Sequence, residues 1–405
     1  MTISYHTLTN GLRLVHVMTP SRVAWCGLAI NAGSRDEQDG HYGLAHFVEH
    51  TIFKGTQHRR AWHILNRMER VGGELNAYTT KEGTMLYSVF PEQHLRRAVD
   101  LLADLVQWSV FPQEELDRER DVVLEEAASY RDTPSDAVYD DFEDLLFAGS
   151  ELGHNILGRK EDLEHLTRED CMRYLKTLYV PSNMAFFSVG PESAERVFHM
   201  AERAFGDMSH AMAPRHRSVP QVVAPFRQVV QIGTHQAHTI VGARVPDMNH
   251  PLRHAFMLLN NILGGPGMNS LLNVELRERR GYVYTVESTL TLLSDCGWME
   301  IYLGCDPDDV KSSLRVIERI TARLGQELLP ARRLEAYKKQ YCGQLIVAAD
   351  NTEFMVMRAG RGMLYHGKVT TIAETIERIQ AVSPDDIANA AAYLSRDALS
   401  SLTFQ

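Results

Sequence analysis

Two histidines and a glutamate occur within five positions of the segment "GLAHFVEHTIFKGT" (residues 43–56), as His46, Glu49 and His50. If this segment is helical, His46 and His50 share a face one turn apart, so both imidazoles can reach one Zn²⁺. Glu49 lies close to the same face, where it can accept a proton from an attacking water molecule instead of binding the metal. The order H-x-x-E-H reverses that of the H-E-x-x-H zinc motif. The pattern therefore predicts a catalytic metal site.

A catalytic zinc usually has three protein ligands and one open position, so a third ligand must come from elsewhere. In "EELDRERDVVLEEAASYRDTP" (114–134), helical spacing places Glu119, Val122, Val123 and Glu126 on one core-facing stripe. Burying a carboxylate is costly unless it is paired or bound to metal. We therefore expect Glu126 to be the third ligand of one Zn²⁺ per chain and Glu119 to be an auxiliary catalytic carboxylate. The alternative is an ordinary helix with solvated glutamates. For Glu125 we do expect a solvated side chain.

A weak internal repeat sets the framework for these residues. "LTREDCMRYLKTLYVPSNMAFFSVG" (166–190) and "VSPDDIANAAAYLSRDALSSLTF" (382–404) both read as a capped helix, a turn and an apolar strand. Their N-cap candidates, Thr167 and Ser383, are 216 positions apart. The same offset aligns the strand predicted at 23–33 with the one at 238–247.

The fold class that follows is α+β, with two homologous domains of about 200 residues each. Helices are predicted at 39–54, 59–72, 92–108 and 113–131, and two strands around a turn at 74–90. Because strands and helices do not alternate strictly, α+β is favoured over a doubly wound sheet. We expect a catalytic domain over 1–210, a linker over 211–227 and a second, degenerate domain over 228–405.

Composition excludes several classes of protein. The chain has 405 residues, 44% of them hydrophobic, and a formal net charge of −10, which argues against nucleic acid as a partner. No run of 18 apolar residues suggests a membrane span, and no secretory signal is evident. Five scattered cysteines without a C-x-x-C pair fit a reducing compartment, so the expected location is the cytoplasm.

These residues together resemble the insulinase/pitrilysin family of zinc metallopeptidases, in the short-chain branch that includes the mitochondrial processing peptidase. The family carries H-x-x-E-H followed by a glutamate 76 residues after the second histidine, which here is Glu126, and another glutamate seven residues earlier, which is Glu119. "GGELNAYTTKEGTMLY" (72–87) and "LGGPGMNSLLNVELRERRGYVYTV" (263–286) resemble two further family segments.

The resemblance implies substrate contacts from both halves of the chain. An Arg and a Tyr seven residues apart match Arg277 and Tyr284, which can donate hydrogen bonds to a developing oxyanion. A helix-end charge is the alternative for Arg277, and Tyr282 is a rival for Tyr284. The segment 75–79 is a plausible edge strand, so Asn76, Ala77 and Tyr78 are expected to bind an extended peptide through the backbone. The alternative is a core strand whose edge is covered. The offset of 216 places Ile262 and Pro266 opposite His46 and His50, so the second copy has no equivalent ligands.

The expected function is therefore a zinc-dependent endopeptidase that acts on extended or unfolded peptides. One alternative is a non-catalytic scaffold or chaperone-like subunit of the same family, and another is a purely structural zinc, which would normally have four Cys or His ligands. In the family a working chamber needs four copies of the α+β unit, whereas this chain has two. We expect a homodimer, with a heterodimer containing a non-catalytic paralogue as the alternative.

Overall fold

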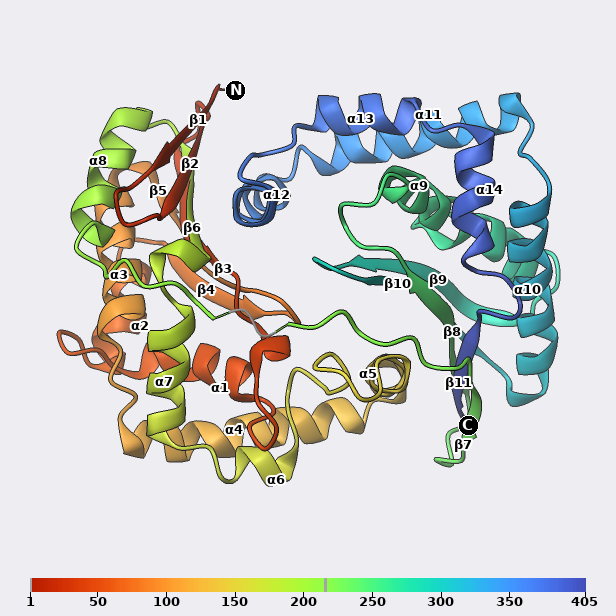
Figure 1. Cartoon of the computed structure of the whole chain (residues 1–405), viewed down its shortest axis with the longest axis horizontal. Helices are drawn as coiled ribbons and strands as arrows, with labels where there is room; N and C mark the ends of the chain where they lie inside the picture. Colours follow the sequence, from red (N-terminus) through yellow and green to blue (C-terminus); the bar gives the residue numbers. More distant parts are fainter. Residues whose placement is uncertain (1, 215–216) are drawn as a thin grey trace. The chain divides into compact units, whose positions relative to one another are not determined.

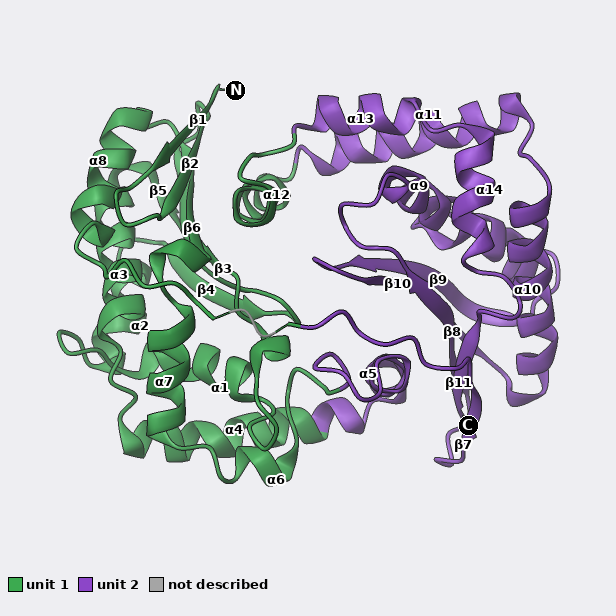
Figure 2. Ribbon diagram, in the orientation of Figure 1, with its two compact units in different colours: residues 1–128, 154–217, 351–370 green, residues 129–153, 218–350, 371–405 purple. Residues whose placement is uncertain are grey.

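The computed structural model describes residues 2–214 and 217–405, and these residues form two compact units (Figures 1 and 2). Unit 1 contains residues 1–128, 154–217 and 351–370, and unit 2 contains residues 129–153, 218–350 and 371–405. Each unit combines one mixed sheet with several helices. The α+β class predicted from the sequence is therefore confirmed.

Unit 1 is built on a six-stranded sheet of order β1-β2-β6-β3-β5-β4. Its strands are β1 (Thr2–Thr7), β2 (Arg13–Met18), β3 (Val23–Ile30), β4 (Glu74–Thr79), β5 (Thr84–Pro91) and β6 (Met184–Gly190). Its helices are α1 (Leu44–Thr51), α2 (Ala61–Glu69), α3 (Leu95–Trp108), most of α4 (Gln113–Arg131), α6 (Lys160–Leu163), α7 (Arg168–Leu178), α8 (Ala194–Phe205) and α12 (Thr352–His366). The helices expected around 39–54, 59–72, 92–108 and 113–131 are all formed, although the first two are shorter than predicted.

Unit 2 is built on a five-stranded sheet of order β7-β11-β8-β10-β9. Its strands are β7 (Arg227–Val230), β8 (Ala237–Val245), β9 (Val283–Leu292), β10 (Gly297–Cys305) and β11 (Ser400–Phe404). Its helices are α5 (Pro134–Leu146), α9 (Arg253–Gly264), α10 (Val310–Gln326), α11 (Ala331–Ala348), α13 (Ile372–Gln380) and α14 (Pro384–Ala392), with a π-helical turn over Asn273–Glu278.

The two sheets share one topology, which supports the internal repeat. In unit 1, β2 pairs parallel with β6, and β6, β3, β5 and β4 then pair antiparallel in turn. In unit 2, β7 pairs parallel with β11, and β11, β8, β10 and β9 follow in the same way. The predicted caps also match, because Thr167 and Ser383 each form a capping box with an aspartate three residues later.

The two repeats exchange one helix each, at equivalent positions. Helix α12, from the second half of the sequence, packs on the unit 1 sheet, where Val356, Ala359 and Met363 join a core with Phe187 of β6. Helix α5, from the first half, packs on the unit 2 sheet, where Phe142 joins a core with residues of β8, β10 and β11. Each sheet thereby buries both faces, since its other face is covered by the remaining helices of its unit.

Because of this exchange, the predicted domain limits and the compact units divide the chain in different ways. The compact units are discontinuous, whereas 1–210 and 228–405 are contiguous segments, so these limits stay a prediction about the two repeats. The physical reason is that a sheet with two apolar faces needs a second cover, and the equivalent helix of the other repeat supplies it.

The cysteines lie in the interior and the helices are those of a globular fold. All five cysteines are buried, as is common for small apolar side chains. Among the described residues, no helix combines the length and the apolar character that crossing a bilayer requires.

Candidate metal centre

Helix α1 carries the two histidines on one face. Leu44, Ala45, Phe47 and Val48 anchor the helix in the unit 1 core. The rings of His46 and His50, one turn apart, have centroids 4.5 Å from each other. His46 is buried and His50 is half-buried. Burial, followed by the nearby charge of His50, lowers the pKa of His46 to about 3. His46 is therefore neutral at ordinary pH, as a metal ligand must be.

Helix α4 brings the third donor to the histidines. Oε2 of Glu126 is 3.7 Å from Nε2 of His46 and 3.5 Å from Nε2 of His50. One ligand atom from each of the three residues lies within 4.8 Å of the other two, and no other group of this kind occurs in residues 2–214 and 217–405. Atoms that each lie about 2.1 Å from a tetrahedral zinc are roughly 3.4 Å apart, so the donor set fits zinc with one position left open.

Glu119, two turns before Glu126 on the same face of α4, fixes the orientation of His50. Its Oε1 is 3.0 Å from Nδ1 of His50, and its Oε2 is 2.6 Å from Nζ of Lys54. Because a carboxylate accepts, Nδ1 of His50 donates, and the lone pair of Nε2 is left toward Glu126. The sequence predicted Glu119 at the site but missed Lys54, which lies four residues after His50 and so follows the same helical spacing.

The stripe predicted on α4 is narrower than expected. Glu119 and Val123 are buried and Glu126 is half-buried, but 48% of Val122 is exposed, so its assignment to a core-facing stripe is wrong. Only the side of α4 that carries Glu119, Val123 and Glu126 faces the interior of unit 1. Glu125 is exposed, as the sequence predicted.

Glu49 projects from α1 beside the histidines. Its Oε2 accepts a hydrogen bond of 2.7 Å from Oγ1 of Thr79, the last residue of β4. Burial raises the pKa of Glu49, and the hydrogen bond from Thr79 opposes part of that rise. A carboxylate with a raised pKa suits a general base. Thr79 was not singled out from the sequence, because the contact joins residues 30 positions apart.

The N-terminus of α1 is held by a buried carboxylate. Oε2 and Oε1 of Glu37 accept from the backbone N–H groups of Gly43 and Ala45 at 2.9 and 2.7 Å. Nε2 of His154 lies 3.0 Å from the same carboxylate. Gly43, with φ of 95°, has no side chain of its own to cap the helix. Glu37 thus supplies the missing cap and fixes where α1 starts, two residues before His46.

The strand proposed to bind substrate is an edge strand of the unit 1 sheet. β4 pairs with β5 and with no second strand among the described residues, with Asn76 opposite Tyr87 and Ala77 opposite Leu86. Ala77 packs toward the core, and the hydroxyl of Tyr78 lies 3.7 Å from Sδ of Met357 in α12. One backbone edge of β4 is therefore available for pairing with an extended peptide.

Arg277 and Tyr284 belong to unit 2, so the geometry of unit 1 does not include them. Arg277 is exposed and lines a pocket of about 410 Å³ beside the glycine-rich loop 264–267. Tyr284 is 59% exposed, and its hydroxyl donates to Asp306 at 3.1 Å. Tyr282 packs against the core of unit 2, which favours Tyr284 as the accessible phenol.

The equivalent position in the second repeat has no ligands. Ile262 is 1% exposed in the unit 2 core, and Pro266 follows α9 in the glycine-rich loop. The repeat has kept the sheet topology and lost the metal-binding chemistry.

Comparison with known proteins agrees with this division. Residues 13–160 match the model of the insulinase family, peptidase family M16, and residues 165–341 match the model described as the peptidase M16 inactive domain. The chain belongs to this family of peptidases.

The relatives support a metallopeptidase. The chain is 31% identical to a protein of Streptomyces coelicolor named as an uncharacterized zinc protease, over 95% of this chain and 86% of that protein. It is also 31% identical to the zinc protease YmxG of Bacillus subtilis, over 94% and 93%. It is 28% identical to the beta subunit of the bovine mitochondrial-processing peptidase, over 94% and 79%. The fold matches that of a Helicobacter pylori protease with a TM-score of 0.92, 21% identity and coverage of 100% and 99%.

Replacing Glu126 tests the ligand set. We expect Glu126→Gln to weaken zinc binding by more than roughly 100-fold, since even outer partners of metal ligands are worth 10- to 100-fold. Glu125→Gln, its exposed neighbour, should bind zinc as the wild type does. Zinc content after dialysis against a graded chelator measures both, and equal retention by the two variants would contradict the assignment of Glu126.

Replacing Thr79 tests the state of Glu49. The hydroxyl stabilises the ionised carboxylate, so Thr79→Val should raise the pKa of Glu49 further. Because Glu49 must be ionised to accept a proton, the acid limb of kcat/KM should move to higher pH by about one unit. Thr79→Ser keeps the donor and should leave the limb in place. An unmoved limb in Thr79→Val would show that the hydrogen bond does not tune the base.

Proposed function

We propose that this chain is a zinc-dependent endopeptidase that hydrolyses extended or unfolded peptides. The observation that carries the proposal is the convergence of His46 and His50 of α1 with Glu126 of α4. Glu49 lies on α1 between the two histidines. Membership of peptidase family M16 and the zinc proteases among the relatives support it. When bound, one zinc per chain supplies Lewis acidity, which polarises a carbonyl and makes water more acidic.

The residues of the chain divide the remaining work. His46, His50 and Glu126 hold the metal, and Glu119 keeps His50 in the tautomer that binds through Nε2. Glu49 accepts the proton of the attacking water and then passes it to the leaving amine. Both transfers need a carboxylate whose pKa is above that of an exposed glutamate, and the half-buried position of Glu49, where desolvation raises its pKa, supports this.

Substrate would lie along β4. A peptide in extended conformation can pair with the backbone of Asn76, Ala77 and Tyr78 as an added strand, in which case folded proteins would be poor substrates. Arg277 and Tyr284 would stabilise the oxyanion, and Tyr284 would have to release Asp306 in order to donate.

A non-catalytic scaffold is the weaker alternative. None of His46, Glu49, His50 and Glu126 is replaced, and no observation in the described residues favours a chain that has lost catalysis.

The function is tested by Glu49→Gln. This variant should retain zinc, because Glu49 is not a ligand, and should lose turnover by about 10²- to 10⁴-fold, the usual contribution of a general base. The assay is hydrolysis of a set of unfolded peptides with mapping of the products. Glu125→Gln serves as the matched control on an exposed position. Near-normal turnover by Glu49→Gln would remove Glu49 from the mechanism, and no turnover by the wild type would refute the function itself.

We further propose that the working form is a homodimer, with a heterodimer containing a non-catalytic paralogue as the runner-up. The beta subunit of the mitochondrial-processing peptidase is by name part of a larger assembly. Mixing inactive Glu49→Gln subunits with inactive Arg277→Ala subunits should restore part of the activity if a site takes Arg277 from the other subunit. A monomer in sedimentation analysis that still cleaves peptides would refute the dimer.

A further inference from the structure

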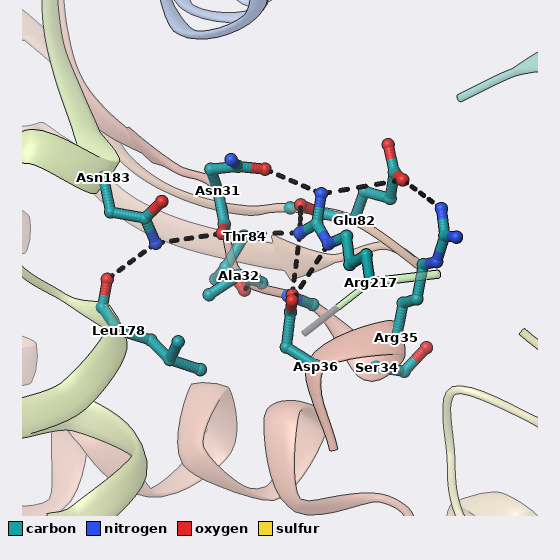
Figure 3. Close-up of polar contacts among 12 residues, drawn as sticks. Asn31, Ala32, Ser34, Arg35, Asp36, Glu82, Thr84, Leu178, Asn183 and Arg217 are labelled. Atoms are coloured by element: carbon teal, nitrogen blue, oxygen red, sulfur yellow. Dashed lines mark hydrogen bonds and ion pairs between the residues drawn. The ribbon is translucent and has the colours of Figure 1, made fainter. Parts of the chain in front are cut away.

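The segment that joins the two repeats contains an arginine that is buried in unit 1. Arg217 lies in the predicted linker, yet only 15% of its side chain is exposed. Nε and Nη2 donate to the two carboxylate oxygens of Asp36 at 2.9 and 2.7 Å, and Nη1 donates to Oδ1 of Asn31 at 2.9 Å (Figure 3). Nη2 also donates to the backbone carbonyl of Glu82 at 3.0 Å. An arginine with every nitrogen engaged is a fixed anchor and not a solvated linker residue.

The anchor holds the turn between β4 and β5. Besides accepting from Arg217 through its carbonyl, Glu82 places its carboxylate 3.5 Å from Nη1 of Arg217 and 2.6 Å from Nη1 of Arg35. The backbone of Arg35 donates to the carbonyl of Lys81 at 2.8 Å. The 31–36 segment and Arg217 of the linker thus both hold the turn. Arg217 itself bonds to the segment and to the turn.

This turn begins one residue after the contact that reaches the proposed base. Thr79, which donates to Glu49 at 2.7 Å, is the last residue of the edge strand β4. Because β4 has a strand neighbour on one side alone among the described residues, its end is held in the sheet by the pairing with β5 and by this turn. A shift of the turn would therefore move Thr79 relative to Glu49.

We propose that Arg217 is a positioning residue for the reaction: by bonding Asp36, Asn31 and Glu82 together, it sets the place of Thr79 and through it the alignment of Glu49. The inference rests on the proposed function, in which Glu49 is the general base. The partners of Arg217, which are Asp36, Asn31 and Glu82, are not among the proposed metal ligands. Its contribution is to kcat, because it aligns a group that acts in the chemical step.

The linker provides a matched control on its other side. Arg244 of β8 donates through Nη1 to the carbonyl of Gln221 at 2.7 Å and through Nη2 to that of Pro220 at 3.0 Å. It therefore holds the linker in unit 2, as Arg217 holds it in unit 1. These two carbonyls and the ring of Phe147, whose centroid is 4.9 Å from the guanidinium carbon of Arg244, belong to unit 2, whereas the 80–83 turn belongs to unit 1. A variant of Arg244 therefore loosens the linker while the bonds of Arg217 to the turn stay in place.

The experiment compares Arg217→Lys, Arg217→Ala and Arg244→Ala with the wild type. Lysine keeps the charge but loses the two-pronged bond to Asp36, so both Arg217 variants should lose kcat by roughly 10- to 100-fold while KM and zinc content stay near the wild-type values. Arg244→Ala should keep the wild-type kcat. Hydrogen exchange, which needs neither metal nor activity, should be faster at residues 33–36 and 79–84 in the Arg217 variants and unchanged there in Arg244→Ala.

The outcomes separate the inference from the function on which it rests. Hydrolysis by the wild type with unchanged kcat in folded Arg217→Lys would refute the inference and leave the proposed function intact. An equal loss of kcat in Arg244→Ala would also refute it, because linker attachment in general would then be the cause. No hydrolysis by the wild type would refute the proposed function itself.

Discussion

The constraint that governs unit 1 is that two imidazole nitrogens and one carboxylate oxygen must converge although they come from two helices far apart in sequence. Helix α1 has eight residues, too few to be stable alone, so its position has to be imposed from outside. Glu37 imposes it at the N-terminus through the first amides, and Glu119 imposes it at His50. The apolar face of α1 packs in the core of unit 1 and holds the helix there. The hydrogen bonds to these two carboxylates then fix its exact position, which the geometry of a ligand set requires.

The buried carboxylates of Glu119 and Glu82 are both paired with cations. Glu119 is balanced by Lys54, and Glu82 by Arg35 and Arg217. Pairing is required because an isolated charge in a poorly solvated place is very costly, whereas a paired and hydrogen-bonded one can be tolerated. Glu49 differs from these groups, since its carboxylate accepts a hydrogen bond from a neutral hydroxyl, that of Thr79. Because this partner is uncharged, burial still raises the pKa of Glu49. A raised pKa suits a carboxylate that first accepts a proton and then donates it.

The two repeats show how a duplicated fold can divide its roles. Both retain the same order of five strands, which preserves the core. At the position of the ligands, the second repeat has an isoleucine in its core and a proline in a loop. The exchange of α5 and α12 makes each compact unit depend on a helix from the other repeat, so neither repeat by itself contains a complete unit.

The sequence alone determined what depends on local geometry: the face of α1, the N-caps at Thr167 and Ser383, the repeat and, through its spacing, the group formed by His46, His50 and Glu126. Helical periodicity makes these features readable, because residues three and four positions apart must share a face. Only the tertiary structure decided that Lys54 and Thr79 complete the surroundings of Glu119 and Glu49, that Val122 is exposed, and that α12 covers the first sheet. It also decided that Arg217 is an anchor within a segment whose composition indicated only a linker. These outcomes depend on which surfaces meet when distant segments pack, and no local period of the chain encodes that.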